Sequence, residues 1–351
     1  MAIEEVTVSA PGPREVLVKL KAVGVCHSDL HVLDGSLPHP APAILGHEAA
    51  GVVEAVGSEV RGVQPGDHVV VLLTFHCGHC EQCEGGNSHR CMPAEAQRSA
   101  EEPPRMTTAG EGLAQFCNVG AFSEKILVHE SGCVPIRKDM PLDRACLIGC
   151  GVTTGFGAVT RAAGVRPGET VAVIGSGGVG LAAINGAVVA GAGRIVAIDR
   201  LPNKLELARQ FGATDTIDAS AIGDVVAEVM AMTSGRGVDH AIECIGLKQT
   251  IEQAYNMLAR GGTATVVGVG KPDTTVEVNA ISLLREKKLQ GSLMGGVRNL
   301  TDVPRFVELY MQGRLKLDEL ISKRRPLSEI NEAFDDLKAG SVARSVIMFN
   351  D

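Results

Sequence analysis

Short apolar runs interrupted by Gly and Pro characterise the first 150 residues of the chain. Four Val-rich runs occupy residues 16–26, 50–57, 67–75 and 123–130. Runs of this length bounded by turn residues predict β-strands. The polar stretch 92–121 contains too many breakers to predict a regular element. We therefore expect a β-rich N-terminal region.

From about residue 151 the pattern changes to strands alternating with helices. Short apolar runs lie at 170–176, 194–200, 238–246 and 263–270. Helical patterns lie between them at 178–192, 202–212 and 248–262. This alternation predicts βαβ units and a doubly wound parallel sheet. Further along, the pattern predicts amphipathic helices within 299–316 and 327–340, and a last strand at 345–349.

Composition narrows the class of protein. A chain of 351 residues suggests about two domains. A net charge of −8 argues against nucleic acid or an anionic membrane as a partner. We expect no apolar run long enough to cross a bilayer, and the N-terminus lacks a secretory pattern. Ten cysteines in such a chain favour metal sites or free thiols in a reducing, cytoplasmic setting.

Four cysteines crowd into one short stretch. Cys77, Cys80, Cys83 and Cys91 lie in the run CGHCEQCEGGNSHRC. Four thiolates at this spacing suit one tetrahedral Zn²⁺, and a complete sulfur shell leaves no position for water or substrate. The pattern predicts a structural zinc site.

A dinucleotide fingerprint lies in the run VAVIGSGGVGLAA. Gly175, Gly177 and Gly180 form G-x-G-x-x-G with Gly178 and Val179 between them. An apolar strand precedes the motif, a helix opens within it, and Asp199 ends the next strand. Such glycines allow a tight turn and close approach of a pyrophosphate, while the acid accepts hydrogen bonds from the ribose.

Asp199 favours NAD over NADP, because a 2′-phosphate would meet a carboxylate. Arg200 beside it would soften this preference.

Three further residues of the N-terminal half are candidate metal ligands. Cys26 lies in GVCHSD, His47 in GHE and Cys150 in LIGCGVTTGFG. Taken singly, a Cys is more often a small buried apolar residue. Together with the other motifs, in the same order, these segments closely resemble the zinc-dependent medium-chain alcohol dehydrogenases over almost the whole chain.

The resemblance implies a fold and a reaction. It implies a β-rich GroES-like catalytic domain at 1–151 and 294–351, and a Rossmann NAD-binding domain at 152–293. It further implies that Cys26, His47 and Cys150 hold a catalytic zinc with one open position, which agrees with the coordination of catalytic zinc generally. Asp29 and Glu48 would orient these ligands.

Other site residues follow from the resemblance alone. Ser28 and His31 would relay the alcohol proton to the surface. The remaining cofactor contacts would be His27, Thr154, Lys204, Val269 and Arg344. The substrate pocket would hold Leu37, Leu73, Phe116 and Leu293 together with Val269, all apolar.

We therefore expect an NAD-dependent enzyme that interconverts a primary or secondary, aliphatic or aromatic alcohol with its aldehyde or ketone. A polyol dehydrogenase, another zinc dehydrogenase of the superfamily, or a non-catalytic NAD-binding relative are the alternatives. Four cysteines lack ligand spacing and are interpreted as structural: Cys117, Cys133, Cys146 and Cys244. His76, His79 and His89 are interpreted as bystanders of the zinc lobe.

Three departures from the family refine these expectations. The chain starts near IEEV, so an edge strand could be missing. The glutathione-dependent formaldehyde dehydrogenase branch carries an acid at the position of Leu37 and an arginine at that of Glu95, which argues against that branch. The long segment between Cys91 and Phe122 favours a homodimer, which would form through the edge strand 287–295.

Overall fold

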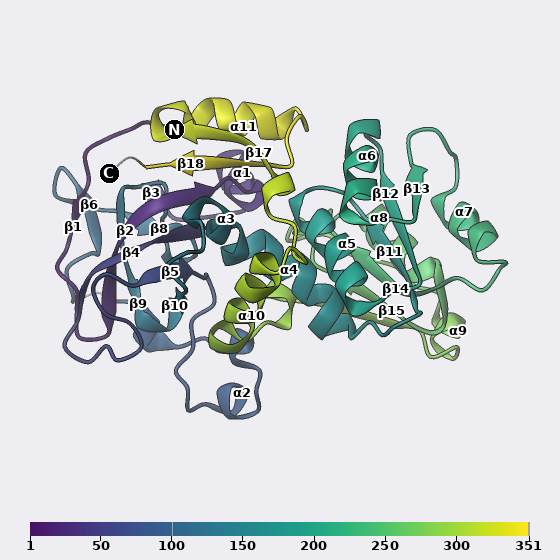
Figure 1. Cartoon of the computed structure of the whole chain (residues 1–351), viewed down its shortest axis with the longest axis horizontal. Helices are drawn as coiled ribbons and strands as arrows, with labels where there is room; N and C mark the ends of the chain where they lie inside the picture. The colour runs from purple at the N-terminus through teal and green to yellow at the C-terminus, as the bar shows by residue number, and fades with distance from the viewer. Residues whose placement is uncertain (100, 350–351) are drawn as a thin grey trace. The chain divides into compact units, whose positions relative to one another are not determined.

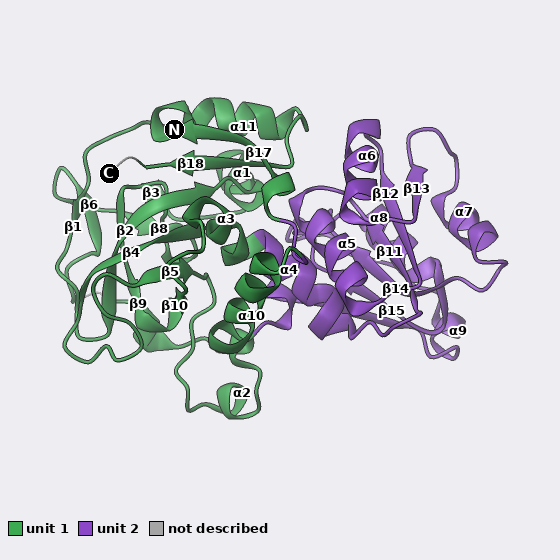
Figure 2. Ribbon diagram, viewed as in Figure 1, with its two compact units in different colours: residues 1–150, 298–313, 317–351 green, residues 151–297, 314–316 purple. Residues whose placement is uncertain are grey.

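The computed structural model describes residues 1–99 and 101–349 in two compact units. Unit 1 contains residues 1–150, 298–313 and 317–351, and unit 2 contains residues 151–297 and 314–316 (Figure 2). Each unit has its own sheet (Figure 1).

Unit 1 is built on a seven-stranded sheet with the order β10-β5-β4-β2-β18-β17, with β9 also pairing with β2. Its strands are β2 (Glu15–Gly24), β4 (Glu48–Val56), β5 (His68–Val71), β9 (Lys125–His129), β10 (Cys133–Ile136), β17 (Ile321–Pro326) and β18 (Arg344–Met348). Alternate valines of β2, such as Val16 and Val18, are fully buried in its core. The C-terminal strand β18 pairs antiparallel with β2 and parallel with the edge strand β17.

Short helices join these strands. They are α1 (His27–Leu33), α2 (Glu81–Glu84), η1 (Ser88–Arg90), η4 (Glu130–Gly132), α3 (Leu142–Leu147), η5 (Ile148–Val152), α10 (Asn299–Met311), η8 (Asp318–Leu320), η9 (Leu327–Glu329) and α11 (Ile330–Lys338). Ile330, Phe334 and Leu337 of α11 are buried against Leu30 of α1. This apolar face at helical spacing explains why the segment is a helix.

The stretch 92–121 contains short strands and helical turns, although its composition predicts no regular element. It forms η2 (Ala94–Ala96), β6 (Met106–Thr108), β7 (Glu111–Gly112), β8 (Ala114–Gln115) and η3 (Phe116–Asn118). Strand β6 pairs with β1 (Thr7–Val8), and β8 pairs with β3 (Ala43–Ile44). The buried carboxylate of Glu15 accepts hydrogen bonds from Arg98 and Arg105. These contacts are distant in sequence, so the local pattern carries no sign of them.

Unit 2 contains a six-stranded parallel sheet with the order β13-β12-β11-β14-β15-β16. Its strands are β11 (Thr170–Ile174), β12 (Arg194–Asp199), β13 (Asp215–Asp218), β14 (Val238–Glu243), β15 (Leu258–Val266) and β16 (Lys288–Gly291). Its helical segments are α4 (Thr153–Gly157), η6 (Ala158–Ala163), α5 (Gly178–Ala190), α6 (Pro202–Phe211), α7 (Val225–Met232), α8 (Lys248–Asn256), α9 (Ala280–Leu283) and η7 (Met294–Gly296). The predicted α/β class with a β-rich region and a doubly wound Rossmann sheet is confirmed.

Two further sequence-based predictions differ from the structure. The helix predicted over 248–262 ends at Asn256, because β15 begins at Leu258, where it pairs with Val238 of β14. The expectation of no apolar run long enough to cross a bilayer is wrong, because the helical run Leu142–Ala163 is long and apolar enough by length and composition. Because 78% of its most apolar 18-residue stretch is buried inside the protein, it is a core helix.

Candidate functional site

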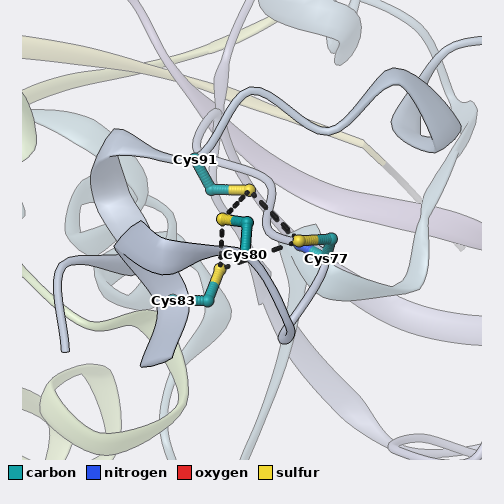
Figure 3. Close-up of side chains that lie close together, drawn as sticks. All are labelled: Cys77, Cys80, Cys83 and Cys91. Carbon is teal, nitrogen blue, oxygen red and sulfur yellow. Dashed lines mark hydrogen bonds between the residues drawn. The ribbon is translucent and has the colours of Figure 1, made fainter. Parts of the chain in front are cut away.

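The four cysteines of the lobe converge as predicted. Successive Sγ–Sγ distances are 3.6 Å from Cys80 to Cys83, 3.7 Å from Cys80 to Cys91, 3.7 Å from Cys91 to Cys77 and 4.0 Å from Cys77 to Cys83 (Figure 3). Sulfurs at about 2.3 Å from a tetrahedral zinc lie roughly 3.8 Å apart. The lobe therefore fits one structural zinc with four thiolates.

A second cluster lies inside unit 1. One ligand atom each from Cys26, His47, Glu48 and Cys150 lies within 4.8 Å of the others, and all four residues are buried. His47 and Glu48 are 0% exposed, in contrast to the half-buried cysteines of the lobe. Titratable side chains at this depth need a strong partner, which a metal ion provides.

Local backbone geometry brings these ligands together. Cys26 directly precedes α1, and His47 follows Gly46, which has a φ of +91°. A Cβ at Gly46 would lie 2.6 Å from the Phe122 nitrogen, so only glycine fits there. Cys150 lies in a π-helical turn, a distortion found often at functional sites.

Asp29 fixes the orientation of His47. Its Oδ1 accepts a hydrogen bond from the Gly46 amide at 2.8 Å and lies 3.2 Å from His47 Nδ1. The proton is therefore assigned to Nδ1, and the buried Nε2 has no hydrogen-bond partner. An imidazole with one nitrogen on a carboxylate and the other free is the usual state of a zinc ligand. The residues of this cluster thus fit a catalytic zinc.

Charge is distributed unevenly over the cluster. The hydrogen bond from Cys150 and the nearby His47 hold the pKa of Cys26 well below its usual range. Burial raises the pKa of Glu48 to about 7 despite the nearby Arg344. Arg344 is 4% exposed and lies 3.4 Å from Glu48 Oε1. Sequence reasoning missed this pair, because the two residues lie at opposite ends of the chain.

Two of the other residues predicted in unit 1, Ser28 and Phe116, contact this cluster. Ser28 Oγ lies 3.8 Å from Cys26 Sγ, and His31 follows one turn later on α1, half-buried. The buried Phe116 ring packs edge-on against His47, with 5.3 Å between ring centroids. Leu37 and Leu73 are half-buried and His27 is exposed. The roles assigned to these residues stay predictions.

In unit 2 the glycine fingerprint has the expected backbone. Gly175 directly follows β11 with a φ of +91°, and a Cβ at Gly180 would lie 1.8 Å from the Gly175 oxygen. A Cβ at Gly177 would meet no atom within 4 Å, so the space before this residue is open to a ligand. Gly177 is the N-cap of α5, with Gly178 and Val179 in the first turn.

Asp199 is already ordered by the fingerprint loop. Its Oδ2 accepts a hydrogen bond from the Ser176 amide at 2.7 Å, and its Oδ1 accepts from Arg200 and Leu201. The sequence analysis did not predict a role for Ser176, because this residue occupies a variable position of the motif. The other residues predicted here range from the buried Thr154 and half-buried Lys204 to the exposed Arg200, Val269 and Leu293.

Among the described residues that were given no role in metal binding, one lies close to other candidate metal ligands. Cys117, Cys133, Cys146 and Cys244 belong to neither metal cluster. His79, however, lies within 4.8 Å of Cys77 and Glu95, and its Nε2 is 3.7 Å from the Glu95 carboxylate.

Family comparisons agree with both units. The family described as "Alcohol dehydrogenase GroES-like domain" matches residues 12–138. The family described as "Zinc-binding dehydrogenase" matches residues 178–311.

Individual relatives match over nearly the whole chain. The chain is 39% identical to the S-(hydroxymethyl)glutathione dehydrogenase of Synechocystis sp., covering 99% of this chain and 96% of the relative. It is 38% identical to that of Saccharomyces cerevisiae, covering 99% and 92%.

Among solved structures, benzyl alcohol dehydrogenase from Acinetobacter calcoaceticus superposes with a TM-score of 0.91 at 34% identity, covering 98% of this chain and 94% of that one. An alcohol dehydrogenase zinc-binding domain protein from Burkholderia ambifaria gives a TM-score of 0.94 at 37% identity, covering 100% and 95%. With two metal clusters and a dinucleotide fingerprint in their expected places, the chain belongs to the zinc-binding medium-chain alcohol dehydrogenase family.

Proposed function

We propose that this zinc- and NAD-dependent alcohol dehydrogenase acts on alcohols that carry an aryl or alkyl group next to the carbinol carbon. The observation that carries this proposal is the buried ring of Phe116, which packs against the ligand His47. A ring at this position favours an apolar substrate body beside the reacting carbon. The benzyl alcohol dehydrogenase of similar structure is consistent with it.

When bound, zinc acts as a Lewis acid on the substrate oxygen and NAD accepts the hydride. The protein holds and orients these groups. Cys26, His47 and Cys150 would hold the metal, Asp29 keeps His47 in the correct tautomer, and Arg344 neutralises Glu48 beside them.

Ser28 and His31 would carry the alcohol proton away from the buried cluster. Both lie on α1, three residues apart and so on one face. Ser28 Oγ is 3.8 Å from Cys26 Sγ, while His31 is half-buried. This arrangement leads from the metal cluster toward solvent, as a general acid–base relay requires.

Asp199 would select NAD. Both of its carboxylate oxygens are held by backbone amides, so the group cannot turn away from a 2′-phosphate. We expect Asp199→Ser to move the ratio of kcat/KM for NAD⁺ over NADP⁺ toward NADP⁺ by at least about tenfold. Steady-state kinetics with both cofactors test this, and an unchanged ratio would contradict the role.

A thiol adduct such as S-(hydroxymethyl)glutathione is the second candidate substrate, because the relatives at 38–39% identity bear that name. Against it, the lobe presents Glu95 in contact with Arg14 at 3.8 Å, so an anionic peptide would meet a carboxylate whose nearest cation is already paired. Glutathione also has no apolar group to pack against the Phe116 ring.

A substrate panel separates the two candidates. NADH absorbance is followed with benzyl alcohol, a primary aliphatic alcohol, a polyol, and formaldehyde with and without glutathione. We expect the highest kcat/KM with benzyl alcohol, and Phe116→Ala should lower it more than that for ethanol. A rate with formaldehyde that requires glutathione and exceeds the others would select the second candidate.

We further propose that unit 1 is the catalytic domain and unit 2 the NAD-binding domain, in a cytoplasmic homodimer. The support for the dimer is the edge strand β16, which pairs only with β15 among the described residues. Ile281 and Leu284 before it are 64% and 80% exposed. Sedimentation of the wild type and of Leu284→Asp tests the dimer, and a monomeric wild type would refute it.

A further inference from the structure

Glu243 is a fully buried carboxylate in unit 2, outside both metal clusters. It is the last residue of β14 and is 0% exposed. In the sheet it lies beside Ile174 of β11 and Val266 of β15. A buried acid at the carboxyl end of a central strand costs desolvation energy unless its hydrogen bonds are satisfied.

This position is where the strand order reverses. The chain builds β11, β12 and β13 toward one edge and then returns to place β14 on the other side of β11. Dinucleotides bind outside the carboxyl ends of strands at such a switch point. Because Asp199 at the end of β12 would hold the adenosine half, the nicotinamide half would extend past β14 toward β15.

Glu243 accepts hydrogen bonds from several donors of the loop that follows β14. Its Oε1 accepts hydrogen bonds from the amides of Ile245 and Gly246, both at 2.9 Å, and from Thr250 Oγ1 at 2.8 Å. Its backbone oxygen accepts from the amides of Val267 and Gly268. Burial raises the pKa of Glu243, while these donors oppose that effect. One residue thus ties the loop after β14 to the loop after β15.

The two loops touch too closely for side chains. A Cβ at Gly246, where φ is +89°, would lie 2.5 Å from the Val269 carbonyl, and one at Gly268 would lie 2.2 Å from the Gly246 amide nitrogen. A Cβ at Gly175 would lie 2.6 Å from the Ile245 side chain. The loop held by Glu243 therefore connects the fingerprint turn to the segment that carries Val269.

We propose that Glu243 is a positioning residue for the nicotinamide half of the cofactor, acting through the hydrogen bonds of its side chain to the 245–246 turn, which packs against the segment that carries Val269. It touches neither metal cluster. The inference rests on the proposed cofactor site and adds a residue to it.

The test measures binding of NADH and of AMP to zinc-loaded protein by calorimetry. Glu243→Ala leaves the amides of Ile245 and Gly246 without an acceptor, so its Kd for NADH should rise at least about tenfold. Its Kd for AMP should stay within about twofold, because AMP occupies only the Asp199 side. Glu243→Gln keeps an oxygen at the Oε1 position and should restore NADH binding to within about threefold of wild type.

Two further variants keep the test decisive. Gly246→Ala pushes directly on the Val269 carbonyl and should reproduce the selective loss of NADH binding if Glu243→Ala does not fold. His240→Gln is the matched control: His240 lies in the same strand, and its Nε2 is 3.0 Å from Glu169. This control should bind both ligands as wild type does.

Equal losses for NADH and AMP, or NADH binding by Glu243→Ala at the wild-type Kd, would overturn the inference alone. A wild-type protein that binds AMP but not NADH would overturn the proposed function together with it.

Discussion

The cysteine lobe and the buried cluster belong to one unit but are built in opposite ways. The lobe takes all its ligands from residues 77–91, leaves them half-buried and surrounds the metal with sulfur alone. The buried cluster takes Cys26, His47 and Cys150 from three distant segments and places a carboxylate, Glu48, beside them. A local site can close its own shell and stabilise its own loop. A site assembled by the fold can hold unlike ligands and leave one position open for chemistry.

The difference extends to what surrounds each site. His47 is held by Asp29 and covered by Phe116, and Glu48 is paired with Arg344. The lobe has the exposed His79 and Glu95 at its rim, neither of which it needs for a complete shell. The buried cluster therefore differs from the lobe in the contacts that orient its ligands as well as in the ligands themselves.

The largest effect should follow from removing a ligand of the buried cluster. His47→Ala should lower kcat/KM at least about 10³-fold, since Lewis-acid catalysis contributes several kcal/mol to the barrier. Zinc content should fall from two to one per chain, while NADH still binds by calorimetry. Activity near wild type would show that His47 is no ligand and that the buried cluster is not the catalytic site.

Removing a ligand of the lobe should affect folding instead. Cys83→Ser leaves three thiolates, and structural zinc contributes folding free energy directly. We expect the melting temperature to fall by about 5–10 °C, corresponding to roughly 2–3 kcal/mol, with one zinc lost and kcat of the remaining folded protein within about threefold. Cys146→Ser, which alters a cysteine outside both clusters, is the control. A Cys83→Ser protein with two zincs and an unchanged melting temperature is the opposing outcome.

Asp29→Asn tests whether support outside the ligand shell matters only at the buried cluster. The amide still reaches Gly46 but removes the carboxylate that fixes the tautomer of His47. We expect a loss of about 10–100-fold in zinc affinity of that site or in kcat. Competition with a zinc chelator should show one weakened site and one normal site. If both sites lose zinc affinity together, the substitution has damaged the fold as a whole and not only the orientation of His47.

The smallest effect should follow from removing His31 from the proposed proton relay. Only the buried cluster needs such a relay, because only there does a substrate react away from solvent. His31→Gln should lower kcat about tenfold at low pH and change the shape of the pH–rate profile, because water partly replaces a general acid–base relay. His79→Gln on the lobe, whose side chain is 75% exposed, should change neither quantity. Identical pH–rate profiles for both variants would remove His31 from the mechanism.

Local patterns determined much of this protein. Thiolate spacing within fifteen residues, the period of apolar positions and the glycine fingerprint are properties of neighbouring residues, so the lobe, the parallel sheet and the turn at Gly175 follow from them. The resemblance to a family supplied the grouping of Cys26, His47 and Cys150, which no spacing argument provides.

Only the tertiary structure decided the rest. Strands β6 and β8 within 92–121 form by pairing with β1 and β3, which lie far away in the chain. The end of α8 is set by pairing of Leu258 with Val238. The Arg344–Glu48 pair and the loops tied by Glu243 exist because sheet packing brings distant segments within hydrogen-bond distance. Charge burial and long-range pairing depend on where the backbone runs in space, and a linear pattern contains no such information.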